Sequence, residues 1–117
     1  MRVETAAFAF LVCAAMASGA SAAGKPTQFW NLVSSTVTKL EISKAGANAF
    51  GPNQTANDPD GAVDHDERLK ITGVMSGAYD VRLTLKDGRT CFARNVNIRD
   101  GKVFSIEDKD LVNCMKP

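Results

Sequence analysis

Apolar and polar residues alternate along much of this chain. The clearest run covers residues 78–86, where Tyr79, Val81, Leu83 and Leu85 are separated by charged and hydroxyl side chains. A period of two is typical of a β-strand with one face buried. Further apolar runs of strand length predict additional strands at 28–33, at 37–43, at 69–72, from Cys91 onward and at 103–106.

Turn residues separate the predicted strands at regular spacing. Asp-Gly pairs at 87–88 and 100–101 are typical of two-residue hairpin turns. The apolar positions of the fifth strand change parity partway along, which predicts a β-bulge near Asn95. Residues 108–117 are expected to form a tail held by Cys114. Six or seven short strands with this spacing predict an all-β fold, either a small antiparallel β-sandwich or a partly open barrel.

One connection, residues 44–66, is much longer than the others. It is polar and rich in Gly, Asn, Asp and Pro. Loops of this length inside a compact domain are usually either functional or disordered. Long loops on rigid β scaffolds commonly carry recognition, so we expect this segment to present a binding surface.

The N-terminus follows a different pattern. Arg2 precedes an uninterrupted apolar run at 6–16, and small residues follow up to Ala23. This three-part pattern is typical of a secretory signal. The apolar run is too short to cross a hydrocarbon core of about 30 Å, which takes roughly 20 residues. We expect residues 1–23 to be cleaved on export, leaving 24–117 as a single periplasmic or secreted domain.

Two of the three cysteines, Cys91 and Cys114, lie in the predicted domain. An even pair in an oxidising compartment favours a disulfide. A metal or redox pair is the alternative, but the chain has no Cys-x-x-Cys and only one histidine. The expected bridge would stabilise the fold by about 3–4 kcal/mol. Cys13 lies inside the predicted signal, where the preceding Val12 makes it a poor lipid-attachment site.

The formal net charge is +1 at pH 7. A nearly neutral chain lacks the basic footprint of proteins that bind nucleic acid or anionic membranes. After Ala23 no apolar segment is long enough to span a bilayer. We therefore expect no nucleic-acid partner and no membrane span. The expected oligomeric state is a monomer, although no sequence feature specifies it.

The end of the long connection is strongly acidic. The segment 56–67 resembles an EF-hand calcium loop in which Gly61 occupies the sharp turn. In that register the metal ligands would be the carboxylates of Asp58, Asp60, Asp64 and Glu67 and the carbonyl of Ala62. Ala56 stands where the first carboxylate is needed, so calcium or a lanthanide would bind weakly. The competing interpretation is a solvated acidic turn.

Other chemistry has less support in the sequence. His65 is the only histidine, and a catalytic role would require a nucleophile or a second base held against it. No Gly-x-Ser-x-Gly elbow is present, so an exposed loop histidine is the simpler interpretation. Trp30 and Tyr79 would suit a sugar-binding platform, although such aromatic residues more often pack in or near a core.

Two patterns resemble known proteins. Gly73 and Gly77 followed by the alternating strand at 79–83 resemble the central hairpin of transthyretin-like and carboxypeptidase-regulatory-like β-sandwich modules, which implies a fold and no activity. The longer resemblance, to small exported bacterial proteins of unassigned function, rests on Phe50-Gly-Pro-Asn53, Asp66-Glu-Arg-Leu69, Gly77-x-Tyr79-Asp80-Val81, Asp87-Gly-Arg89-x-Cys91 and Asp110-Leu111-x-x-Cys114. Many such proteins have Trp at the position of Phe50. This resemblance implies a β-sandwich with one disulfide and is silent about chemistry.

Together these patterns predict a secreted or periplasmic, non-enzymatic binding module that uses 44–66 to contact a protein or small-molecule ligand. No cofactor is expected. One alternative is a protein that binds calcium or a lanthanide weakly through 56–67. The second alternative is a small envelope hydrolase, which has little support.

Overall fold

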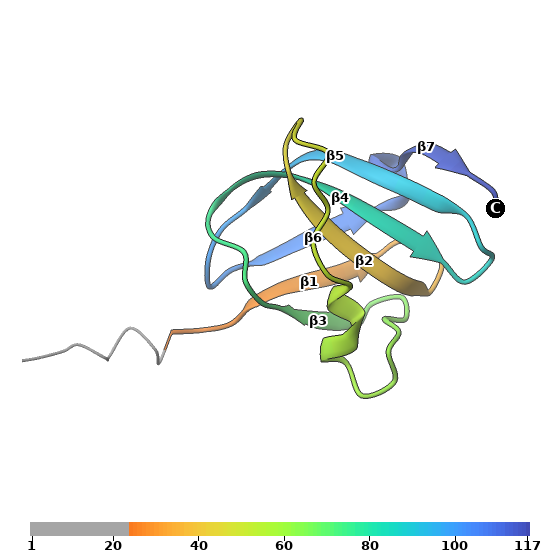
Figure 1. Cartoon of the computed structure of the whole chain (residues 1–117). Helices are drawn as coiled ribbons and strands as arrows, with labels where there is room; N and C mark the ends of the chain where they lie inside the picture. The colour runs from red at the N-terminus through yellow and green to blue at the C-terminus, as the bar shows by residue number, and fades with distance from the viewer. Residues whose placement is uncertain (1–23) are drawn as a thin grey trace, which may run out of the picture.

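The computed structural model describes residues 24–117, so the predicted signal and Cys13 lie outside the described part of the chain. Two open β-sheets face each other, as Figure 1 shows, and the predicted sandwich is confirmed. The strands are β1 (Thr27–Leu32), β2 (Val37–Lys44), β3 (Arg68–Ile71), β4 (Gly77–Leu85), β5 (Thr90–Ile98), β6 (Val103–Glu107) and β7 (Val112–Met115). The predicted tail therefore contains a short strand, β7.

The three-stranded sheet has the order β3-β1-β6 and the four-stranded sheet the order β2-β4-β5-β7. All ladders are antiparallel except that between β1 and β6, which is parallel and pairs Phe29 with Phe104. The Asp-Gly pair at 87–88 forms the expected hairpin, in which Gly88 has a φ of 93°. The pair at 100–101 also forms a turn, but it joins β5 to β6, which belong to different sheets. The prediction of a second hairpin was therefore wrong in its pairing.

The predicted bulge is confirmed. The β4–β5 register shifts between Tyr79 and Val81, and Asn95 has a φ of 57°. The extra residue moves the buried side chains of β5 from one parity to the other, as the sequence pattern indicated.

The core lies between the two sheets. Large side chains that are almost fully buried come from both layers: Phe29, Leu69 and Ile106 from one sheet and Leu40, Val81, Leu83 and Leu85 from the other. Apolar alternation therefore predicted correctly the buried positions Leu40 and Ile42 of β2 and Val81, Leu83 and Leu85 of β4, whereas Ser43 and Asp80, predicted on the opposite faces, are buried as well.

The long connection covers the outer edges of β2 and β3, which are edge strands of their sheets. It contains a 3₁₀ helix (η2, Gln54–Asn57), which lies beside β3 in Figure 1. Gln54 Nε2 donates to the Thr72 carbonyl just after β3 at 2.9 Å, and Asn57 Nδ2 donates to the Lys70 carbonyl at 2.8 Å. These contacts satisfy backbone groups that an edge strand otherwise leaves open to another chain.

On the β2 side, Asn53 Oδ1 accepts hydrogen bonds from the N–H groups of Leu40 at 2.9 Å and Thr55 at 3.0 Å. Val63 is fully buried and forms a bridge with Val37. Residues 53–63 therefore close one side of the sandwich, and this part of the connection has a structural role.

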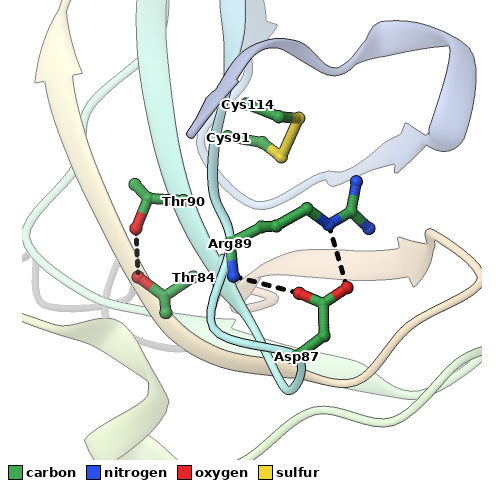
Figure 2. Close-up of a disulfide and its surroundings, with 6 residues drawn as sticks. All are labelled: Thr84, Asp87, Arg89, Thr90, Cys91 and Cys114. Carbon is green, nitrogen blue, oxygen red and sulfur yellow. Dashed lines mark hydrogen bonds and ion pairs between the residues drawn. A yellow bond between two sulfur atoms is a disulfide. The ribbon is translucent and has the colours of Figure 1, made fainter. Parts of the chain in front are cut away.

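The predicted disulfide between Cys91 and Cys114 is present, as Figure 2 shows. Cys91 is fully buried on β5, whereas every residue of β7 is exposed. The bridge thus fastens a solvent-exposed edge strand to the interior of the four-stranded sheet. Within residues 24–117 no helix is both long and apolar enough to cross a membrane.

Candidate binding groove

A groove of about 610 Å³ lies where the start of the long connection approaches the turn between β3 and β4. A volume of this size is typical of small-molecule sites. The residues that line it come from two segments distant in the sequence: Ile42, Ser43, Lys44, Ala49 and Gly51 from the first, and Gly73, Met75, Ser76, Gly77, Ala78 and Tyr79 from the second.

Ile42 and Tyr79, at 7% and 9% exposure, are the two most buried large apolar side chains of the groove. The Tyr79 hydroxyl donates to the Met75 carbonyl at 2.8 Å, which fixes both the ring and the turn that precedes β4. A Cβ at Gly77 would lie 3.3 Å from the Tyr79 ring, so glycine permits this close approach. The groove is therefore built around a side chain that is held at both its ring and its hydroxyl.

The serine hydroxyls of the groove are already engaged within the protein. Ser43 Oγ donates to the Lys44 carbonyl and accepts from the Ala49 N–H, both at 2.9 Å. Ser76 Oγ accepts from the Asp100 N–H at 2.8 Å. These contacts tie the two lining segments to their surroundings and preform the groove.

Asp80 anchors residues 42–51, the first of the two segments that line the groove. Its carboxylate accepts hydrogen bonds from the N–H groups of Gly46 and Asn95, each at 3.0 Å, and lies 3.4 Å from Arg94 Nη1. The bonds from Gly46 and then Asn95 hold the pKa of Asp80 below its usual value, with Arg94 adding to them and burial opposing them. Alternation along β4 predicts an exposed Asp80, and nothing in the sequence indicated its contacts with Gly46 and Asn95.

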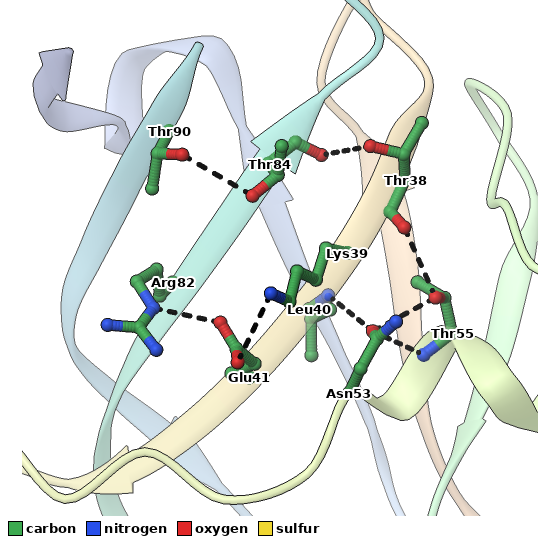
Figure 3. A network of polar contacts seen from close by, with 9 residues as sticks. All are labelled: Thr38, Lys39, Leu40, Glu41, Asn53, Thr55, Arg82, Thr84 and Thr90. Carbon is green, nitrogen blue, oxygen red and sulfur yellow. Dashed lines mark hydrogen bonds and ion pairs between the residues drawn. The ribbon is translucent and has the colours of Figure 1, made fainter. Parts of the chain in front are cut away.

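Figure 3 shows a network of polar contacts that joins β2, β4 and β5 to one another and β2 to the segment at Asn53 and Thr55. Arg82 Nε donates to Glu41 Oε1 at 2.8 Å, and the same guanidinium lies 4.2 Å from the Phe50 ring centroid. The rings of Phe50 and Phe92 are 5.9 Å apart. Phe50 is thus packed onto the sheet, and it fixes the chain between Ala49 and Gly51 where that chain lines the groove.

The structure does not gather the predicted calcium ligands around one point. Asp58 Oδ1 accepts from the Asp60 N–H at 2.8 Å, Asp64 Oδ1 from the Thr36 hydroxyl at 2.8 Å, and Glu67 Oε1 from the Asp64 N–H at 2.9 Å. Across residues 24–117 no group of three or more His, Cys, Asp or Glu side chains is placed to hold a metal ion. Calcium binding through these residues and the Ala62 carbonyl stays a prediction without structural support.

His65 and Trp30 do not line the groove. Tyr79 does line it, and it lies on the other sheet from Trp30. His65 Nδ1 is 2.9 Å from the Val33 carbonyl, a contact that fits a loop-anchoring role. Trp30 is on the outer face of β1, where its Nε1 donates to Asp66 at 3.0 Å and Arg68 lies 4.8 Å from its ring. Tyr79 is buried on the other sheet, so the two aromatic residues do not form one sugar-binding platform.

Comparisons with protein-family models, with curated proteins and with solved structures found no match for this chain. The resemblance to small exported bacterial proteins therefore stays a prediction, and the arguments about function rest on the chain's own residues.

Proposed function

We propose that this protein is an exported, non-enzymatic binding module that holds its ligand in the groove between 42–51 and 73–79. The observation that carries the proposal is the groove itself, a preformed hollow of about 610 Å³ beside the long connection. Largely apolar clefts with a few polar groups are the usual form of small-molecule sites.

The chemistry of the lining favours binding over catalysis. The hydroxyls of Ser43, Ser76 and Tyr79 all have partners within the chain, at 2.8–2.9 Å. A nucleophilic mechanism requires a base beside such a hydroxyl, and none of the residues lining the groove is His, Asp or Glu. Lys44 is the one lining residue that carries a charge.

Two features support export. The Cys91–Cys114 disulfide fits an extracellular or periplasmic compartment, where such bridges persist. The pattern of residues 1–23 is that of a secretory signal.

The test is to titrate isotopically labelled protein with small-molecule and protein fractions of the envelope of the exporting cell and to follow its amide resonances. We expect shifts clustered at 42–51 and 73–79. In Ala49→Trp, which fills the groove, the shifts should disappear, whereas the matched variant Ala47→Trp, in the same loop but outside the lining, should retain them. Shifts confined to other surfaces, or shifts that Ala49→Trp leaves unchanged, would refute the groove as the binding site.

A further inference from the structure

The groove combines apolar side chains and polar surface with a single charged side chain. Ile42, Met75 and Tyr79 supply the larger apolar side chains, and alanine and glycine residues supply much of the remaining wall. The ammonium of Lys44 forms no ion pair among residues 24–117. The hydroxyls of Ser43 and Tyr79 donate to backbone carbonyls, whereas that of Ser76 only accepts. Lys44 and the Ser76 O–H are therefore the side-chain donors left for a ligand, and only Lys44 is charged.

Met75 extends the apolar surface beyond the groove. Met75 is 77% exposed, the highest value for any large hydrophobic residue in the described chain. Its main chain is fixed, because its carbonyl accepts the Tyr79 hydroxyl. A flexible thioether on a fixed backbone can fold over ligands of differing shape, as methionine does at adaptable binding surfaces.

We propose that the ligand is an anionic amphiphile: an aliphatic chain that lies against Ile42, Tyr79 and Met75 and ends in one carboxylate that pairs with Lys44. This inference rests on the proposed function and names the ligand class of the same groove. Burial of the chain supplies the favourable free energy, since it removes apolar surface from water. The carboxylate is placed at Lys44, where a partly solvated ion pair adds selectivity and a smaller share of the affinity.

Four matched probes distinguish the contribution of the ligand's aliphatic chain from that of its charge. Octanoate carries both, octanol carries the chain alone, octylammonium carries the chain with the opposite charge, and acetate carries the charge alone. Amide titrations of the purified protein should show octanoate binding at 42–51 and 73–79, octylammonium binding more weakly than octanoate, and acetate causing no shift there.

Variants of Lys44 then test the charge. Lys44→Gln should weaken octanoate binding by up to about fivefold, the upper end of the range for an exposed ion pair, and leave octanol unchanged. Lys44→Arg should retain octanoate binding. Lys70→Gln, which removes an exposed lysine of β3 outside the groove, is the matched control and should alter neither titration.

The outcomes separate this inference from the function on which it rests. If octanol and octylammonium bind in the groove as octanoate does, and Lys44→Gln has no effect, the anionic class is wrong while the groove remains a binding site. If none of the probes shifts the groove resonances but an envelope fraction does, the amphiphile is excluded and the binding module stands. If neither probes nor fractions act on the groove, both proposals fail.

Discussion

At the scale of single residues, Asp80 joins the loop after β2 to the bulge of β5. Its carboxylate connects the loop at Gly46 with the β5 bulge at Asn95 while being only 5% exposed. A buried carboxylate is stable when it accepts several hydrogen bonds, and here two backbone donors and Arg94 satisfy it.

Replacing Asp80 with Asn should destabilise the protein by about 1–3 kcal/mol, because the amide group of Asn would place donors against the Gly46 or Asn95 N–H. Urea unfolding at neutral pH measures this change. The exposed Asp60→Asn is the matched control, with an expected effect within about 0.5 kcal/mol. An equally small effect for Asp80→Asn would contradict the structural role.

The same contacts predict how stability depends on pH. The folded-state pKa of Asp80 lies below the ordinary value of 3.8, so its contribution is present above that value and is lost as pH falls through the lowered pKa. The difference in unfolding free energy between wild type and Asp80→Asn should therefore shrink below pH 3.8. A difference that grew with acidification would reverse the sign and reject the assignment.

Asp80 also shows where prediction from sequence stops at this scale. Alternation correctly placed Val81, Leu83 and Leu85 in the core and placed Asp80 on the opposite face. That face is covered locally by the 44–46 loop and the bulge, which are distant in the sequence. The burial of Asp80 therefore depends on tertiary contacts, which the local alternation of apolar and polar residues cannot predict.

At the scale of elements, the segment from Asn53 to Asn57 closes one side of the sandwich by capping the edges of two strands. Asn53→Ala removes the acceptor for the Leu40 N–H and should cost about 1–2 kcal/mol. Amide hydrogen exchange at Leu40 should quicken. Asn97→Ala, on an exposed position of β5, is the control and should leave Leu40 protected. Equal protection in both variants would mean that the cap is dispensable.

The acidic part of the same connection gives a second test at this scale. Because its carboxylates accept separate local hydrogen bonds, we expect calorimetric titration of calcium or a lanthanide to give the same heats for wild type and for the Asp60→Asn, Glu67→Gln double variant. A saturable heat that only the wild type shows would establish the calcium loop instead.

Strands and turns were predicted correctly where they depend on residues close together in the sequence. The Asp-Gly turn at 100–101 was correctly placed, yet β5 and β6 separate into different sheets there. The parity of apolar residues reports which face of a strand is buried and carries no information on which strand lies beside it. The parallel pairing of β1 with β6 depends on long-range packing and was missed for the same reason.

At the scale of the whole molecule, the long connection was predicted to present a binding surface, but its parts have different places in the structure. Residues 53–63 seal the sandwich, and only the portion up to Gly51 lines the groove. The other wall comes from 73–79, which the sequence marked only as a turn and a strand. The groove is a product of the folded arrangement, so the sequence predicted a binding loop without its cavity.

Export is a prediction about the whole chain. If residues 1–23 are a cleaved signal, N-terminal sequencing of the exported protein should begin at Ala23 or Gly24. Recovery of the intact chain from Met1 in the cytoplasm of the producing cell would contradict export.

If the groove between 42–51 and 73–79 binds the aliphatic chain of an amphiphile, the chain protons of octanoate should give isotope-filtered nuclear Overhauser effects to the labelled protein. We predict contacts with Ile42, Met75 and the Tyr79 ring at saturating octanoate. Contacts confined to Trp30 or Phe92 on the outer faces of the sheets would contradict the account, as would the absence of contacts to any residue that lines the groove.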